Sequence, residues 1–304
     1  MTAVSKLKKL ILAAAAVVMT AGLAACSTQL AKYDDKKPLG PQVNYTITGI
    51  DAGAGIMAGT QRVIKDYGLD KDNWQLQTSS TAAMTTQLGK AIKNKQAIVV
   101  TGWTPHWMFT KYKLKFLKDP KLTYGKAEDI HTITRVGLKK DMPSANTVLD
   151  RFYWTPDQMS DVMLKVNGGM EPRKAAREWL KEHPAQLKKW TAGVKHVHGN
   201  SIHMTYVAWD SEIASTYVVA EALRKVGYKP VLQAMEMQPL WASIATSKAD
   251  AMTCAWLPNT SGRYFHMYRS KVVDLGVNLK GAQVGLAVPT YMKNINSIAD
   301  LKKK

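Results

Sequence analysis

The chain has 304 residues, of which 46% are hydrophobic, and carries a formal net charge of +19 at pH 7. This hydrophobic content can fill a sizeable core, which excludes an intrinsically disordered protein. The positive charge suggests a nucleic-acid partner, but the lysines are scattered and no basic run is interleaved with stacking aromatics, so we expect no nucleic acid as partner. A basic surface facing an anionic cell envelope explains the charge as well.

The N-terminus has the pattern of an export signal. Lysines within the first ten residues precede an apolar run that is too short for a transmembrane helix. The run ends in Leu23-Ala24-Ala25-Cys26, which resembles a lipobox, the motif at which a bacterial signal peptidase cuts before a lipidated cysteine. We therefore predict a signal peptide at residues 1–25 and a lipid on Cys26. A flexible tether at residues 26–42 would then hold the protein at the extracellular face of the cell membrane.

After the tether, strand and helix patterns alternate in two passes. The first pass predicts strands at residues 45–50, 74–78 and 97–101, with helices at 56–67 and 81–93. The second pass predicts strands at 204–208, 231–234 and up to 255, with helices at 212–226 and 240–247. Two more helices are expected between the passes, at 155–166 and 172–190. This alternation predicts an α/β fold with a largely parallel sheet in each pass.

Three of the nine tryptophans follow apolar strand patterns. Both passes close with a tryptophan and a proline two residues later, at Trp103 and Trp256, and Trp209 follows a further strand. Ligands of open α/β sheets bind beyond the carboxyl ends of the strands. A quaternary ammonium group forms no hydrogen bonds, so aromatic faces are the groups that hold it selectively. Two interpretations stay open here: an aromatic cage for such a cation, or three core tryptophans. The other tryptophans at strand and helix positions are expected to pack (Trp74, Trp154, Trp179, Trp190 and Trp241).

A glycine-rich turn opens the first predicted helix. Its sequence, Gly53-Ala54-Gly55-Ile56, loosely fits a dinucleotide-binding pattern. Such a site needs an acidic residue at the end of the second strand, and residues 78–81 contain none, so we expect no nucleotide and no other cofactor. Backbone amides at a helix N-terminus still bind anions, and a ligand carboxylate suits that position.

Four segments together resemble the substrate-binding lipoproteins of glycine betaine ABC transporters in Gram-positive bacteria. They are GIDAGAGIM at 49–57, TGWTPHW at 101–107, YVAWDSE at 206–212 and AWLPNT at 255–260. The resemblance implies a periplasmic-binding-protein-like fold of two lobes that close on the ligand. One lobe would hold residues 43–134 and 288–304, and the other residues 135–287. It also implies that Trp103, Trp209 and Trp256 enclose a trimethylammonium group, while the amides of Gly55 and Ile56 bind the carboxylate.

The family's histidine after the Leu-Pro-Asn-Thr segment is replaced here by Ser261. A serine can still donate a hydrogen bond to the carboxylate, but it is shorter and uncharged. Carnitine and proline betaine are therefore candidate ligands beside glycine betaine. The resemblance implies a monomer without enzymatic activity, which delivers its ligand to ABC permease and ATPase subunits for osmoprotectant uptake.

Two other classes of function compete with this interpretation. A metal-binding exported lipoprotein is the main alternative, because His196, His198 and His203 lie within eight residues, although no acid or cysteine stands beside them to complete a site. A hydrolase could use His106 as a base, but no nucleophile motif is present. Cys254 lies in an apolar stretch and is expected to be a core thiol.

Overall fold

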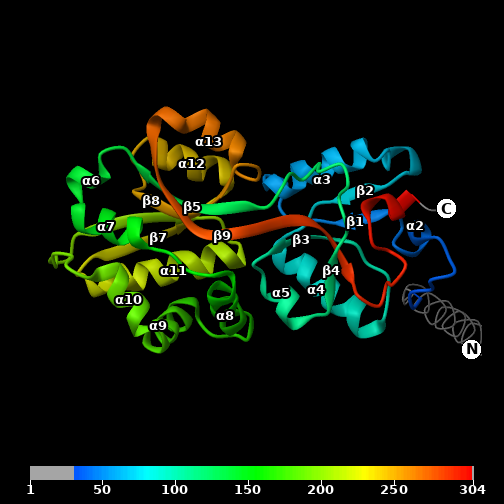
Figure 1. Cartoon of the computed structure of the whole chain (residues 1–304), viewed down its shortest axis with the longest axis horizontal. Coiled ribbons are helices and arrows are strands. Elements are labelled where there is room, and N and C mark those ends of the chain that lie inside the picture. The colour runs from blue at the N-terminus through cyan, green and yellow to red at the C-terminus, as the bar shows by residue number, and fades with distance from the viewer. Residues whose placement is uncertain (1–30, 303–304) are drawn as a thin grey trace, which may run out of the picture.

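The computed structural model describes residues 31–302, so the predicted signal peptide and the lipidated Cys26 lie outside the described residues. Strands and helices alternate along the described chain, which confirms the α/β class. Within this part of the chain, nine strands form one sheet in the order β2-β1-β3-β9-β5-β8-β6-β7, with β4 paired to β9. The long strand β9 (Val272–Pro289) runs through the middle of the molecule and connects two lobes (Figure 1).

Lobe 1 combines parallel and antiparallel strands. β1 pairs in parallel with β2 and β3, whereas the end of β9 pairs antiparallel with β3 and β4. The elements of lobe 1 are α2 (Leu39–Gln42), β1 (Thr46–Thr48), α3 (Gly55–Asp66), η1 (Asp70–Asp72), β2 (Gln75–Gln77), α4 (Thr81–Asn94), β3 (Val100–Thr104), α5 (Trp107–Lys111), β4 (Leu114–Phe116) and η3 (Ile298–Lys302). The sheet is mixed rather than largely parallel, because β9 returns to this lobe beside β3.

Lobe 2 repeats this arrangement. β6 pairs in parallel with β7 and β8, and β5 pairs antiparallel with β8 and with the beginning of β9. Its elements are β5 (Glu128–Arg135), α6 (Leu138–Asp141), α7 (Pro143–Arg151), α8 (Pro156–Asn167), α9 (Pro172–Glu182), α10 (Pro184–Thr191), β6 (Ser201–Tyr206), α11 (Asp210–Lys225), β7 (Lys229–Ala234), α12 (Met237–Ala245), β8 (Ala251–Leu257), α13 (Gly262–Tyr268) and η2 (Arg269–Lys271). In Figure 1, α8 to α11 lie below this half of the sheet and α12 and α13 lie above it.

The strand pairing shifts both predicted lobe boundaries. Residues 128–134 belong to β5, which pairs with β8 and β9 inside lobe 2, although the sequence places them in lobe 1. Residues 283–287 of β9 pair with β3 of lobe 1, although the sequence places them in lobe 2. The chain therefore crosses between the lobes just before Glu128 and again near Gln283.

The segment from residue 31 to residue 42 is folded against lobe 1 and is not an extended tether. The amide of Tyr33 donates a hydrogen bond to the carbonyl of Lys95 at 2.7 Å. Leu39 is buried and packs in the core. Only residues before 31 remain for the predicted tether, and these lie outside the described part of the chain.

Local signals in the sequence explain several helix ends. The hydroxyl of Thr155 accepts a hydrogen bond from the amide of Gln158, and the side-chain oxygen of Gln158 accepts one from the amide of Thr155. Helix α8 therefore begins with a capping box followed by Pro156. The single helix expected at 172–190 is two helices, because Pro184 cannot donate a backbone hydrogen bond in a helix interior. No helix within residues 31–302 is long and apolar enough to span a membrane.

The tryptophans that were expected to pack are all buried. Trp74, Trp154, Trp179, Trp190 and Trp241 are at most 3% exposed. Three of them cluster in lobe 2, where the ring centroids of Trp179 lie 5.8 Å from Trp154 and 6.2 Å from Trp190. Cys254 is also buried, and burial raises the pKa of its thiol, as expected of a core residue.

Candidate functional site

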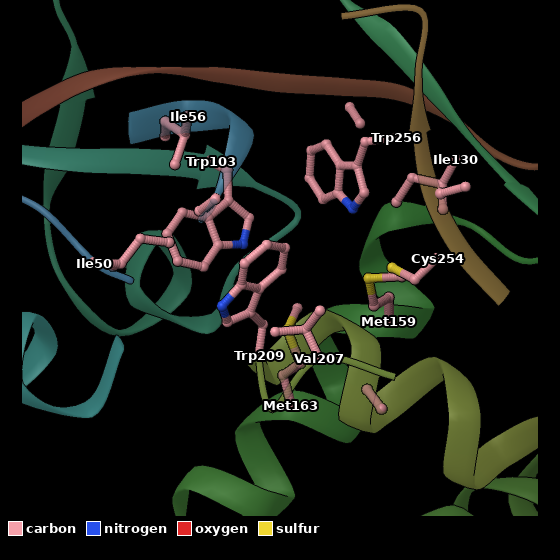
Figure 2. Close-up of a cluster of buried hydrophobic side chains, with 14 of the residues drawn as sticks. Ile50, Ile56, Trp103, Ile130, Met159, Met163, Val207, Trp209, Cys254 and Trp256 are labelled. Atoms are coloured by element: carbon pink, nitrogen blue, oxygen red, sulfur yellow. The ribbon is translucent and has the colours of Figure 1, made fainter. Parts of the chain in front are cut away.

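A pocket between the two lobes brings together the three tryptophans that follow the strand patterns. Trp103, Trp209 and Trp256 all line it, and their exposed fractions are only 5%, 7% and 4%. Figure 2 shows the three indoles turned toward a common space. The other lining residues are small, apolar or hydroxyl-bearing: Ile50, Ala54, Ile56, Ser211, Thr260 and Val284. No charged side chain lines the cavity.

Two of these indoles occupy corresponding positions in the two lobes. Trp103 is the last but one residue of β3 and Trp256 the last but one of β8, so both lie inside a strand rather than after it. Each strand is followed by a cis peptide bond to proline, at Pro105 and Pro258. Trp209 differs, because it is the N-cap of α11, beyond the end of β6. All three nevertheless lie at the carboxyl ends of strands, where an open α/β sheet binds its ligands.

The glycine-rich turn brings a helix start to the same cavity. α3 begins at Gly55, and the side chain of Ile56 lines the cavity. The amides of Gly55 and Ile56 have no hydrogen-bond partner within residues 31–302. They are the first free donors of the helix and point their partial positive charge toward its N-terminal side. Gly55 is also a point of close approach, since a Cβ there would overlap the carbonyl oxygen of Thr260 from lobe 2.

Ser261, the third predicted carboxylate contact, is not among the residues that line the cavity. The preceding residue, Thr260, lines the cavity instead. The spacing of the motif could not distinguish Thr260 from Ser261. Ser261 is 1% exposed and its amide donates to the carbonyl of Trp256 at 2.8 Å. Its hydroxyl has no hydrogen-bond partner in the described part of the chain. A buried donor next to the cavity wall is therefore unengaged.

A buried carboxylate positions the loop that carries Thr260. Glu128, at the start of β5, accepts hydrogen bonds from the amides of Asn259 at 3.0 Å and Thr260 at 2.9 Å, and from the hydroxyl of Thr260. Burial raises the pKa of Glu128, and these hydrogen bonds oppose the rise. No local pattern in the sequence points to Glu128, because its partners lie more than a hundred residues away.

Contacts from lobe 1 to lobe 2 surround the cavity. The indole Nε1 of Trp209 donates to Asp51 at 3.1 Å. His106 accepts from the amide of Met108 through Nδ1 and faces Asp210 through Nε2 at 3.2 Å, so Nε2 is the donor to Asp210. The ring of His106 also packs edge-on against Trp103, with 4.6 Å between centroids. His106 therefore orients an indole and joins the lobes, which is a structural role and not that of a catalytic base.

A second buried carboxylate holds the loop that precedes Trp209. Glu212, on the first turn of α11, is 3% exposed and accepts a hydrogen bond from the amide of Val207. Burial raises the pKa of Glu212 to about 8, and the hydrogen bond from Val207 opposes the rise. Figure 2 shows Val207 between Trp209 and the buried methionines of α8. Glu212 thus secures the loop that carries Trp209.

The alternative of a metal site is wrong. Within residues 31–302, no group of three or more His, Cys, Asp or Glu side chains could hold a metal ion. The rings of His196 and His198 lie 5.7 Å apart, but no further ligand joins them. Three histidines close in sequence are insufficient, because metal coordination requires side chains that converge in space.

Comparison with known proteins identifies relatives along nearly the whole chain. The sequence profile of the "Substrate binding domain of ABC-type glycine betaine transport system" matches residues 14–182 and 200–304. The glycine betaine/carnitine transport binding protein GbuC of Listeria monocytogenes serotype 1/2a (strain 10403S) is 67% identical over 296 residues, which are 97% of this chain and 99% of that protein.

Two solved structures are also similar. Lactococcal OpuAC, in its closed-liganded conformation with glycine betaine, is 46% identical over 55% of this chain and 64% of that chain, with a TM-score of 0.48. The glycine/betaine/L-proline-binding protein ProX from Borrelia burgdorferi is 34% identical over 55% of this chain and 63% of that chain, with a TM-score of 0.49.

Proposed function

Because the chain belongs to the family of substrate-binding domains of ABC-type glycine betaine transport systems, we propose that it captures glycine betaine or a close trimethylammonium analogue for uptake into the cell. It is a transport protein and not an enzyme. The observation that carries the proposal is the cavity between the lobes, which is lined by three indoles and by no charged side chain.

The indoles suit a trimethylammonium group better than an ordinary ammonium. A primary ammonium needs three hydrogen-bond acceptors when it leaves water, and the only side-chain acceptors among the lining residues are the hydroxyls of Ser211 and Thr260. A trimethylammonium group needs none and is attracted to the faces of aromatic rings, each worth about 1–2 kcal/mol when desolvated. Three such faces add up to several kcal/mol, which accords with roughly micromolar capture once the carboxylate is also held.

The start of α3 suits the ligand carboxylate. The free amides of Gly55 and Ile56 lie at the positive end of a 12-residue helix, where anions bind without a charged side chain. The unengaged hydroxyl of Ser261 would supply a further donor after a small shift of the loop that Glu128 holds. Carnitine keeps both the trimethylammonium and the carboxylate, and the Listeria relative is described as a glycine betaine/carnitine binding protein.

The proposed function also includes attachment to the membrane and a set of transporter partners. Cys26 would carry a lipid that holds the protein as a monomer at the extracellular face of the membrane. ABC permease and ATPase subunits would then accept the ligand from it. The lipobox pattern and the membership of an ABC transport family support this arrangement.

Calorimetric titration tests the proposal. The chain from Ser27 onward keeps every described residue and would be titrated with glycine betaine, carnitine, choline and glycine. We expect saturable binding of glycine betaine and none of glycine at millimolar concentration. Separate Trp103→Ala and Trp256→Ala variants should lose about ten-fold or more in affinity, whereas Tyr153→Ala, at an exposed ring outside the cavity, should not. Equal binding of glycine and glycine betaine would refute the aromatic cage.

A further inference from the structure

A groove on lobe 2 carries an excess of positive charge. It lies between α9, the start of α10 and the end of α11. In Figure 1 these helices lie below the sheet of lobe 2, whereas the indole cavity lies between the lobes. Five lining residues are cationic and one is acidic: Arg173, Arg177, Lys181, Arg224, Lys225 and Glu221. The remaining lining residues are Leu180, Pro184 and Leu187.

The single carboxylate fixes two of the five cations. The side chain of Glu221 is 9% exposed, and one of its oxygens accepts from Nε of Arg173 at 2.8 Å and from Nη1 of Arg224. Two guanidinium groups are thus held side by side. A guanidinium has five N–H donors, so each retains donors for another anion. A pair of pre-positioned guanidiniums matches the geometry of a phosphate group.

The other three cations of the groove have no ion-pair partner within residues 31–302. The acidic side chains of the same region are engaged elsewhere. Glu171 accepts from two amides at the start of α9, Glu178 pairs with Lys174 at 4.0 Å, and Glu182 pairs with Lys165 at 2.7 Å. None of these carboxylates lines the groove. The positive charge there is therefore left uncompensated.

Helix stability alone does not explain this charge. Arg224 and Lys225 lie in the last turn of α11, where cations favour the helix dipole. Lys181 lies in the last turn of α9 in the same way, but Arg173 and Arg177 do not. These three residues of α9 follow one another at intervals of four. Like charges at this spacing destabilise a helix. An anion bound in the groove would relieve that repulsion.

We propose that this groove binds a phosphate-bearing anion. The two guanidiniums held by Glu221 would contact the phosphate oxygens, and Arg177, Lys181 and Lys225 would surround them with charge. Two sources present this chemistry at a cell surface: the headgroups of anionic phospholipids and soluble polyphosphates. Both present phosphate groups, and the experiment below distinguishes phospholipid headgroups from soluble polyphosphates.

The test compares two double variants of the chain from Ser27 onward. Arg177→Gln with Lys181→Gln removes two charges from the groove, and Lys188→Gln with Lys189→Gln removes two exposed charges from α10 outside it. Tripolyphosphate would be titrated by calorimetry at about 0.1 M salt. Sedimentation would measure binding to vesicles of phosphatidylcholine with and without phosphatidylglycerol. Thermal melting with and without tripolyphosphate reports folding and binding together.

The groove variant should lose about ten-fold or more in affinity for tripolyphosphate, while the matched control loses about three-fold or less. It should also lose the rise in melting temperature that tripolyphosphate causes in the parent. A parallel loss on phosphatidylglycerol vesicles assigns the groove to lipid headgroups, and an unchanged vesicle affinity assigns it to soluble phosphates. Equal losses in the two double variants, or no binding of either probe by the parent, would overturn the proposal.

Discussion

Replacing Gly55 by alanine should block closure of the two lobes without disturbing either of them. Gly55 begins α3 in lobe 1, and a Cβ at this position would lie well under 3.0 Å from the carbonyl oxygen of Thr260 in lobe 2. The nearest atom, the carbonyl oxygen of Thr260, belongs to the backbone, so a side-chain rotation cannot relieve the overlap. Alanine fits the helical conformation of Gly55, and the clash exists only when the lobes are together.

The size of the effect follows from this overlap. Overpacking at a tight contact costs about 1–3 kcal/mol. Since the cost falls on the closed state alone, it weakens ligand affinity by roughly 5- to 150-fold. The free energy of unfolding of the unliganded protein should stay the same or rise, because alanine favours a helix more than glycine does.

Gly53→Ala is the matched control, since it lies in the same turn and a Cβ there meets nothing within 4 Å. Calorimetry with glycine betaine would give the dissociation constants, and small-angle scattering would report closure. We expect weak binding and no ligand-induced compaction for Gly55→Ala, with parental behaviour for Gly53→Ala. If Gly55→Ala binds as tightly as Gly53→Ala, the close approach of Gly55 to Thr260 is not a feature of the liganded protein.

Three further predictions concern polar groups around the cavity. Burial raises the pKa of Glu212 from 4.5 to about 8, so between these pH values the folded protein keeps a proton that the unfolded chain releases. The free energy of unfolding should therefore fall by several kcal/mol from pH 5 to pH 8. Urea unfolding of Glu212→Gln should remove most of this slope, and parallel pH profiles would contradict the assignment. Ser261→Ala should weaken the binding of glycine betaine about ten-fold. The affinity for choline, which lacks the carboxylate, should stay the same. Equal effects on both ligands would exclude a contact between Ser261 and the carboxylate. Asp51→Ala should increase the dissociation rate of glycine betaine about three- to ten-fold, because Trp209 loses its hydrogen-bond partner in the other lobe. Stopped-flow fluorescence measures this rate. An unchanged rate would show that the hydrogen bond does not hold the closed form.

The parts of the fold that follow from local patterns were predictable. The strand that became β1 and the helices that became α3 and α4 follow from hydrophobic periodicity, and Thr155 marks the start of α8. The course of β9 was not predictable in this way. Its two ends pair with strands more than a hundred residues away, in different lobes, and no local pattern records such pairing.

The candidate site shows the same division. The recurrence of tryptophan and proline after two strands identified Trp103 and Trp256 as equivalent positions, and the structure places both at one cavity. The groups that hold the site together could not be found from spacing. Glu128 bonds to Thr260, 132 residues away, and Asp51 to Trp209, 158 residues away. Only the folded chain brings these partners together.

A crystal structure of the protein with glycine betaine tests the central claim most directly. We expect the trimethylammonium group to lie against the faces of Trp103, Trp209 and Trp256. The carboxylate should lie within hydrogen-bond distance of the amides of Gly55 and Ile56. A ligand bound elsewhere, or one whose ammonium group pairs with an acidic side chain while the indoles pack against one another, would contradict it.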